Sequence, residues 1–200
     1  MESLIIQKAK DLFFNYGLKS VSMDDLAKVA GISKKTIYQE FSDKNQLVNY
    51  IVDDLLAQHH KAFNESRTLS KDAVEEVVKQ SLHLFDTWAS VNPGFYYELE
   101  KFFPAAWFKL EQHKNKVLLP GIIENLRRGK AEKNYREELD VAFTADLRII
   151  QLNNALYQNV FSGRRMSTSV LIMNLTSFYL HGITTEKGKK LISKYIKEPE

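Results

Sequence analysis

The sequence predicts an all-α protein, and three observations lead to that prediction. Apolar residues recur at the spacing of an amphipathic helix, the alternation typical of a strand never persists, and glycine and proline fall between the periodic stretches. The chain has 200 residues, of which 44% are hydrophobic, enough for one larger helical domain and a small appended one. We therefore expect a three-helix domain over residues 1–46 and a larger helical domain over residues 47–200.

The first helix is predicted upstream of Gly17, because an apolar stripe of helical spacing ends there and glycine commonly terminates helices. A second and a third helix follow within residues 23–41, MDDLAKVAGISKKTIYQEF. Leu26 and Ala30 stand four residues apart, which places them on one face of a short helix, and Gly31 is suited to end it. The stripe of the first helix consists of Leu4, Ile5, Ala9, Leu12, Phe13 and Tyr16.

The third helix is predicted to begin after Ser33, whose hydroxyl can accept the backbone N–H of Lys35 or Thr36. Two helices joined by a short turn that contains glycine have the geometry of a helix-turn-helix, whose second helix can enter a DNA groove. Similar pairs occur in many helical proteins, so the pattern alone favours DNA binding only modestly. The apolar side of the third helix consists of Ile32, Ile37 and Phe41, and its other faces carry Lys34, Lys35, Thr36, Tyr38 and Gln39.

Residues spread over the first quarter of the chain resemble, in register, the tetracycline-repressor (TetR) family of bacterial transcriptional regulators. Beyond that quarter the family shares architecture rather than sequence. The resemblance implies an all-helical homodimer with an N-terminal operator-binding domain and a C-terminal domain that binds a small effector and dimerises. The matching residues are Ala9, Leu12, Phe13, Gly17, Ser22, Leu26, Ala27, Ala30, Gly31, Ile32, Ser33, Thr36, Ile37, Tyr38, Phe41, Lys44 and Leu47.

The resemblance also implies that the third helix lies in the major groove of a double-stranded DNA operator. We assign base reading to Lys34 and Gln39, because lysine suits the acceptors of guanine and glutamine can pair with adenine. Thr36, Tyr38 and Lys44 are predicted to anchor phosphates without reading sequence. The full set of predicted DNA-binding residues is Ser22, Ser33, Lys34, Lys35, Thr36, Tyr38, Gln39 and Lys44.

Three positions of the predicted three-helix domain, which we call the head, have a less definite role. Ser22 stands where the family often has threonine, a cap that also approaches the DNA backbone, and Lys35 suits either base or phosphate contact. Glu40 departs from the family pattern, which often has histidine or tyrosine against a phosphate. It is either a specificity device or a solvent-facing residue held off the duplex, and we favour the second.

Net charge is a weak argument for DNA binding in this chain. The formal net charge is +3, and residues 1–50 carry seven lysines against six acidic residues, a net of +1. The argument therefore rests on where the lysines lie, because Lys34, Lys35 and Lys44 cluster at two predicted helix starts. Binding is expected to weaken steeply with salt.

The rest of the chain is predicted to be helical throughout. Asn92-Pro93-Gly94 and Ser162-Gly163 mark breaks, and Pro104 begins a helix. The helix over residues 43–65 is predicted to be continuous and is expected to join the two domains rigidly. The predicted helices cover residues 43–65, 70–91, 94–102, 104–111, 113–130, 138–161, 167–182 and 185–197.

Aromatic residues are concentrated between Phe85 and Phe108, which favours a pocket for a flat or hydrophobic ligand. For any single ring, packing in a helical core is the better interpretation. The resemblance nevertheless implies an effector cavity among these middle helices, so as a group they are expected to include part of its wall. The predicted contacts of a small hydrophobic or aromatic effector are Phe85, Trp88, Tyr97, Phe103, Trp107 and Tyr157, with His83 or Asn153 as polar contacts.

The helices predicted over residues 138–161 and 167–182 have broad apolar faces, wider than packing along a single buried stripe requires. In the family, two such helices from each subunit form a four-helix dimer interface. A twofold homodimer would present two recognition helices to successive major-groove faces, so the operator should be near-palindromic. The alternative is that these faces are buried only within the monomer.

Several other classes of protein find no support in the sequence. There is no cysteine, which excludes disulfide frameworks and thiolate sites. His59 and His60 are adjacent and diverge, and no metalloprotease, nucleophile-elbow, P-loop or dinucleotide motif occurs, so we expect no enzyme, metal or cofactor. No signal peptide or stretch of roughly 20 apolar residues is present, and a cytoplasmic protein without a membrane partner is expected.

The sequence therefore predicts a ligand-responsive transcriptional regulator that binds a palindromic operator as a homodimer. We expect a repressor whose DNA affinity falls when the effector binds, although an activator would need the same parts. The alternatives are a helical dimeric interaction protein that has lost DNA binding and, with least support, an enzyme. Glu40 and the near-neutral head are the only support for the first alternative.

Overall fold

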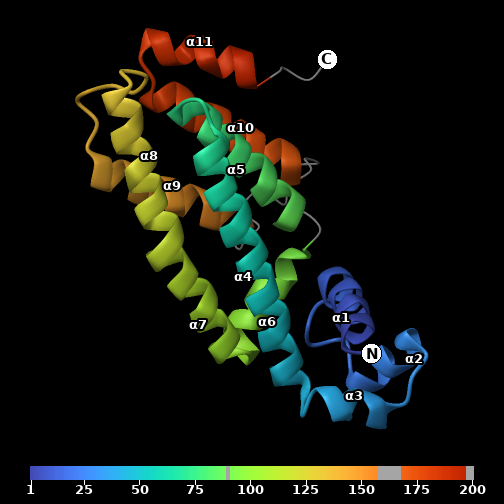
Figure 1. The fold of residues 1–200 in the computed structure, drawn as a ribbon. Coiled ribbons are helices and arrows are strands. Elements are labelled where there is room, and N and C mark those ends of the chain that lie inside the picture. The colour runs from blue at the N-terminus through green and yellow to red at the C-terminus, as the bar shows by residue number, and fades with distance from the viewer. Residues whose placement is uncertain (89–90, 157–167, 197–200) are drawn as a thin grey trace. The chain divides into compact units, whose positions relative to one another are not determined.

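The computed structural model describes residues 1–88, 91–156 and 168–196, and the described residues are helical with no β-strand (Figure 1). A single isolated bridge pairs Tyr135 with Thr184. The all-α prediction is therefore confirmed. The helices are α1 (Glu2–Tyr16), α2 (Met23–Ala30), α3 (Lys34–Glu40), α4 (Lys44–Leu69), α5 (Ala73–Trp88), α6 (Pro93–Phe102), α7 (Pro104–His113), a π-helical turn (Lys114–Leu118), α8 (Leu119–Ala131), α9 (Val141–Leu156), α10 (Thr168–Ile183) and α11 (Glu186–Tyr195).

The chain forms two compact units, which we call unit 1 and unit 2. Unit 1 consists of Met1–Ala57 with Ser90–Gln112, and unit 2 consists of Gln58–Ala89 with His113–Glu200. Unit 1 therefore contains the N-terminal three-helix head and also α6 and nearly all of α7. The sequence pattern did not indicate that these two helices pack with the head.

The head of unit 1 has a continuous apolar core. Phe13 of α1, Leu26 of α2 and Ile37 of α3 are all fully or almost fully buried. Burial of this apolar area is what stabilises helices as short as α2 and α3, which would be marginal alone. The core residues of the head and of the start of α4 are Ile5, Ala9, Phe13, Leu18, Val21, Met23, Leu26, Ala27, Ile37, Phe41, Leu47, Val48, Ile51 and Val52.

The start of α6 is attached to the end of α1 within unit 1. The backbone N–H of Asn92 donates to the carbonyl of Phe14 at 2.9 Å, and the rings of Phe14 and Phe95 meet edge to face at 5.4 Å. One turn further on, Glu98 accepts the backbone N–H of Lys19 at 2.8 Å. Polar and aromatic contacts together therefore fix α6 against the segment that enters the helix-turn-helix.

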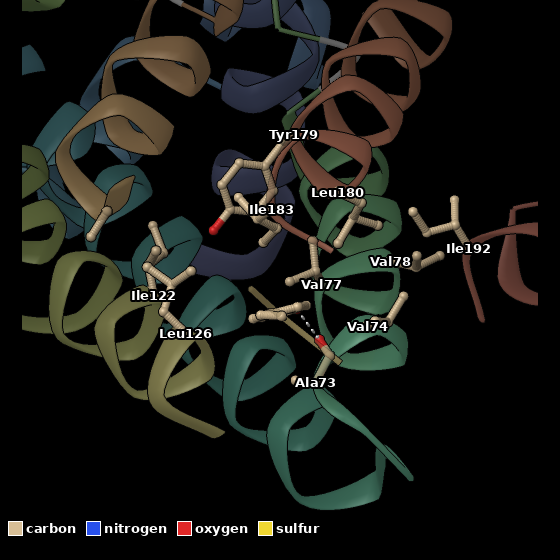
Figure 2. Packing of buried hydrophobic residues seen from close by; sticks show 12 residues of the cluster. Ala73, Val74, Val77, Val78, Ile122, Leu126, Tyr179, Leu180, Ile183 and Ile192 are labelled. Carbon is tan, nitrogen blue, oxygen red and sulfur yellow. Dashed lines mark hydrogen bonds between the residues drawn. The ribbon is translucent and has the colours of Figure 1, made fainter. Parts of the chain in front are cut away.

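Unit 2 has its own core, formed by α5, α8, α9, α10 and α11. Figure 2 shows labelled apolar side chains of α5, α8, α10 and α11 pointing toward one another. The hydroxyl of Tyr135 donates to the carbonyl of Ala73 at 2.9 Å. The residues of this cluster are Ala73, Val74, Val77, Val78, Ile122, Leu126, Tyr135, Ala145, Tyr179, Leu180, Ile183 and Ile192.

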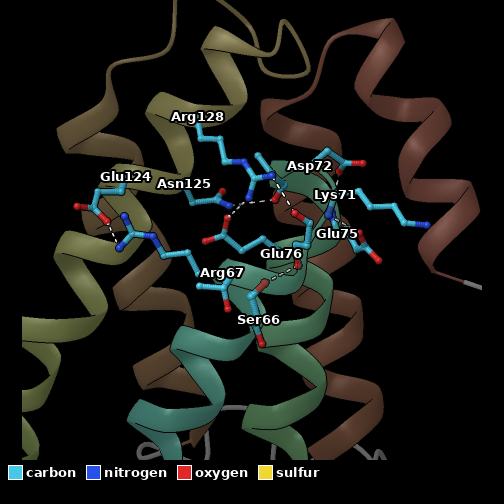
Figure 3. Close-up of polar contacts among 12 residues, drawn as sticks. Ser66, Arg67, Lys71, Asp72, Glu75, Glu76, Glu124, Asn125 and Arg128 are labelled. Atoms are coloured by element: carbon cyan, nitrogen blue, oxygen red, sulfur yellow. Dashed lines mark hydrogen bonds and ion pairs between the residues drawn. The ribbon is translucent and has the colours of Figure 1, made fainter.

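A polar network lies beside this core where α4 ends and α5 begins (Figure 3). The guanidinium of Arg128 donates to Glu76 at 3.0 Å, to Glu132 at 2.7 Å and to the carbonyl of Ser70 at 3.0 Å. Burial raises the pKa of Glu76, and its hydrogen bonds to Asn125 and Arg128 oppose that rise. This network pairs a partly buried cation with two carboxylates.

The helix predicted over residues 113–130 differs from the structure near its start. Residues Lys114–Leu118 form a π-helical turn before α8 begins at Leu119. Pro120 has no N–H to donate to the carbonyl four residues earlier, and an interruption of this kind in the ladder favours a wider turn. The helix predicted over residues 138–161 is described as α9 (Val141–Leu156): residues 138–140 precede the helix, and residues 157–161 lie outside the described residues.

Candidate DNA-binding surface

Helix α2 begins with a capping box. The backbone N–H of Asp25 donates to the hydroxyl of Ser22 at 3.1 Å, and the backbone N–H of Ser22 donates to the Asp25 carboxylate at 2.9 Å. The Ser22 hydroxyl also donates to the Asp25 carboxylate at 2.6 Å. This hydrogen bond, followed by the one from the backbone N–H of Ser22, lowers the pKa of Asp25, because both stabilise the charged form. Ser22 is exposed, so its first role is to fix the start of α2.

The turn between α2 and α3 has the geometry that its residues predict. Gly31 has φ 66° in the left-handed region, and its N–H and that of Ile32 bond to carbonyls at the end of α2. Ser33 then caps α3, because the N–H of Thr36 donates to its hydroxyl at 3.1 Å. The hydroxyl of Thr36 is also 2.8 Å from that of Ser33, so both predicted DNA contacts are engaged in the cap.

The two sides of α3 differ in burial. Ile37 is fully buried and Phe41, which follows the helix, is 3% exposed. On the other side Tyr38 is 42% exposed, and Lys35 and Gln39 are also exposed. Lys35, Tyr38 and Gln39, which are predicted to contact DNA, therefore lie on the side of α3 that faces away from Ile37.

Lys34 and Glu40 lie at opposite ends of α3. The ammonium of Lys34 donates to Asp24 of α2 at 2.8 Å, and this hydrogen bond raises the pKa of Lys34. Both partners are exposed, and such a pair is weak enough to open when a phosphate or base competes. Glu40 is exposed.

Lys44 has a role that the sequence did not reveal. Its ammonium donates to the carbonyls of Leu18 and Val21, the latter at 2.5 Å, and lies over the Phe13 ring at 5.5 Å. Burial lowers the pKa of Lys44. In the free protein this side chain therefore holds the loop between α1 and α2, a role additional to the phosphate contact predicted for it.

The sequence-family model described as bacterial regulatory proteins of the tetR family matches residues 5–51. This range covers most of α1, then α2, the turn, α3 and the start of α4. The chain belongs to the TetR family. It is a transcriptional regulator with a helix-turn-helix, and the relatives that support this are regulators rather than enzymes.

Relatives of this TetR-family protein match nearly its whole length. The uncharacterized HTH-type transcriptional regulator YvaF of Bacillus subtilis is 24% identical over 173 residues, covering 84% of this chain and 88% of YvaF. The HTH-type transcriptional repressor KstR2 of Mycolicibacterium smegmatis is 22% identical, with 93% and 92% covered. A putative regulator of Saccharomonospora viridis, crystallised with choline, has the same fold, with a TM-score of 0.77, 18% identity and coverage of 92% and 97%.

The residues predicted to contact an effector are divided between the two units. Tyr97 is exposed, Phe103 is buried and Trp107 is half-buried, and all three lie in unit 1. His83 of α5 and Asn153 of α9 are half-buried in unit 2. The backbones of Phe85 and Trp88 belong to α5, but their side chains and the whole of Tyr157 lie outside the described residues.

Two buried polar groups of unit 2 were not identified as candidates from the sequence. His59 Nδ1 lies 2.9 Å from His113 Nε2, although the two residues are far apart in the chain. Arg148 of α9 is 4% exposed, and the only sequence signal was one basic residue within an otherwise apolar helical period. No group of three His, Cys, Asp or Glu side chains in the described ranges is arranged to hold a metal ion.

Membrane insertion finds no support in the described part of the fold. There, none of the helices has both the length and the apolar character that crossing a bilayer requires.

Proposed function

We propose that this TetR-family regulator is a ligand-responsive repressor that binds a near-palindromic operator as a homodimer. The exposed outer side of α3, opposite the buried Ile37, is the observation that carries the proposal. In this proposal residues 1–46 form the DNA-binding domain, and residues 47–200 bind the effector and dimerise.

Within the operator complex, Gln39 and Lys34 read bases, and Tyr38 contacts a phosphate. Lys35 is exposed and, in the described part of the chain, no ion pair is formed by it. It is therefore available to neutralise a phosphate without breaking an internal contact. Ser22, Ser33 and Thr36 contribute by fixing the starts of α2 and α3, from which their hydroxyls can also approach the backbone of the duplex.

The proposed dimer uses one face of α9 and α10. Phe143, Leu147 and Ile150 recur at helical spacing on α9 and are exposed, and Phe178 of α10 is 73% exposed. Large apolar side chains gathered on adjacent helices are typical of an interface, because leaving them in water is unfavourable. Their exposure in the single chain supports burial against a second copy.

The repressor role is supported by the similarity to KstR2, which is a transcriptional repressor. A small effector is supported by the structure of the Saccharomonospora viridis regulator, which contains choline. We propose that the effector stabilises a state whose recognition helices are wrongly spaced for the operator. Thermodynamic linkage then requires that the operator weakens effector binding by the same factor by which the effector weakens operator binding.

Selection of bound fragments from random double-stranded DNA tests this function. We expect the full-length protein to enrich an inverted repeat, with half-site centres about one helical turn (34–36 Å) or a multiple apart. A matched selection with the Gln39→Ala variant should enrich a different base at one position of each half-site. Failure to retain any duplex at low ionic strength would contradict the proposal and favour a protein-interaction role.

A further inference from the structure

Arg148 is a fully buried cation on the inner side of α9. Its Nη2 donates to the hydroxyl of Thr176 at 2.9 Å and to that of Ser81 at 3.4 Å, and its Nη1 donates to the carbonyl of Leu175 at 3.4 Å. Its guanidinium also lies over the Tyr179 ring at 4.7 Å. Helices α5, α9 and α10 thus meet around this one group.

All of these partners are neutral. Within the residues that the structure describes, no carboxylate forms an ion pair with Arg148, and its Nε–H has no acceptor. Arg128 in the same unit provides an internal comparison, because it is bonded to both Glu76 and Glu132. Arg128, the less buried of the two arginines, therefore has two carboxylate partners. Arg148, the more buried one, has none among the described residues.

An unpaired guanidinium is costly in such a place. Desolvation lowers the pKa of Arg148 to about 10, which leaves it charged at neutral pH. Buried charges in proteins are normally paired, and the penalty for a lone buried ion is several kcal/mol in general. An anion that reached Arg148 would supply the missing counter-charge and remove part of that penalty.

Gln151 lies one helical turn after Arg148 on α9 and provides a second polar group. Its side-chain oxygen is buried and makes no hydrogen bond. The two ends of a glutamine amide are interchangeable by rotation, so the buried end can also be an N–H donor. Arg148 and Gln151 can therefore donate to the two oxygens of one carboxylate.

A second copy of this chain that packs on the exposed Phe143 and Ile150 does not supply that anion, because Arg148 lies on the opposite side of α9. It is buried within unit 2 itself, beside the apolar cluster that contains Ala145, Tyr179 and Leu180. A small molecule with an anionic end and an apolar body would match the chemistry of these neighbours, because a few polar groups can orient an otherwise apolar ligand.

We propose that the effector of this regulator is an amphipathic carboxylic acid whose carboxylate binds Arg148, with Gln151 as a second donor. This inference rests on the proposed function and specifies the chemical class of its effector.

The test measures ligand binding to the full-length protein in the absence of DNA. Dodecanoate and cholate provide a flexible and a rigid apolar carboxylate, and dodecanol and methyl cholate are their uncharged counterparts. We expect at least one carboxylate to raise the Tm measured by circular dichroism, and its uncharged counterpart to have a much smaller effect. Arg148→Met should weaken carboxylate binding by about tenfold to a hundredfold, whereas Lys190→Met, at an exposed position of α11, should not change it.

The variant without ligand provides a separate readout. Because Arg148→Met removes an unpaired buried charge, its Tm without ligand should equal or exceed that of the wild type. If the variant does not fold, Arg148→Lys keeps the charge but loses the bidentate geometry, and it should still reduce the difference between carboxylate and uncharged counterpart.

Two results would overturn the inference: neither carboxylate stabilises the wild type, or the Arg148 variants bind carboxylate as well as the wild type does. Either result, together with retained binding of the selected operator, rejects the carboxylate effector and leaves the DNA-binding function intact. Loss of operator binding by the wild type would instead reject the proposed function.

Discussion

Lys34 and Lys35 are neighbours on α3, yet their side chains end in different surroundings. Lys34 is bonded to Asp24, whereas Lys35 is exposed and has no ion pair in the described part of the structure. An exposed ion pair contributes little to stability, so both lysines are available to DNA. The difference is that Lys34 must break its ion pair with Asp24 before it can contact DNA.

Substitution of Lys35 and of Gln39 should therefore affect DNA binding in different ways. We expect Lys35→Ala to weaken binding to the operator and to unrelated duplex DNA alike. The slope of log K against log salt concentration should become shallower by about one. Gln39→Ala should cost about 1–3 kcal/mol on the operator and alter base preference. Fluorescence anisotropy over a salt series measures both effects, with Lys190→Ala as a control; equal behaviour of the two α3 variants would contradict the assignment.

Lys44 leads to a prediction about stability. Because its ammonium bonds to the carbonyls of Leu18 and Val21, Lys44→Met should leave these acceptors without their donor. We expect the variant to lose about 1–3 kcal/mol of folding stability, measured by urea unfolding without DNA. If Lys44 acts only on phosphates, unfolding will be unchanged and only DNA affinity will fall.

At the scale of elements, the helix-turn-helix depends on how its short helices start and end. Two glycines in unit 1 have positive φ, Gly31 at 66° and Gly17 at 85°. Nothing lies within 4 Å of a Cβ added at Gly31, whereas a Cβ at Gly17 would be 2.9 Å from a carboxylate oxygen of Glu98. Gly31 is therefore needed for its backbone conformation, and Gly17 also for the close approach of α6.

These two positions form a matched pair. Gly31→Ala should cost about 1–2 kcal/mol, the usual penalty of left-handed backbone for an L-residue. Gly17→Ala should cost more, because it also displaces Glu98 from the N–H of Lys19. Thermal unfolding of both variants measures the difference, and the double variant Gly17→Ala with Glu98→Ala should recover part of the loss if the contact is responsible.

The contact between the end of α7 and the middle of α4 gives a pH dependence. Burial, followed by the charge of neighbouring histidines, lowers the pKa of His59 to about 3 and of His113 to about 4. An unfolded chain would protonate both near pH 6.5, so unfolding takes up protons between roughly pH 4 and 6.5 and stability falls as pH decreases through that window. The contribution is fully present only above about pH 6.5.

We expect unfolding at pH 5 to take up about two protons at these histidines, and about one in the His113→Gln variant. The slope of the unfolding free energy against pH gives the total proton uptake, so the difference between the two slopes gives the contribution of His113. The same slope in both proteins would show that His113 is not held in its neutral form.

At the scale of the whole molecule, the α9 and α10 faces lead to a prediction about assembly. Phe178→Glu should place a charge in the proposed interface. Leu69→Glu is the control, because Leu69 of α4 is 71% exposed and Phe178 is 73% exposed. We expect only Phe178→Glu to produce a monomer in sedimentation and to lose operator affinity by about a hundredfold or more, because the half-sites are no longer linked. A wild-type monomer at micromolar concentration would contradict the dimer.

The sequence alone determined the all-α class, the helix-turn-helix and most helix positions, because caps, breaks and apolar spacing are local signals. Ser22, Gly31 and Ser33 have the roles that their residue types indicate. The sequence-based DNA and effector assignments remain predictions.

Only the tertiary structure decided which distant groups meet. It joined α6 to the N-terminal helices through Glu98 and Lys19, which are 79 positions apart, and it turned Lys44 toward two carbonyls. It also buried Arg148 with no carboxylate partner among the described residues. Local periodicity carries no record of such contacts, because they depend on how helices pack rather than on how each helix forms.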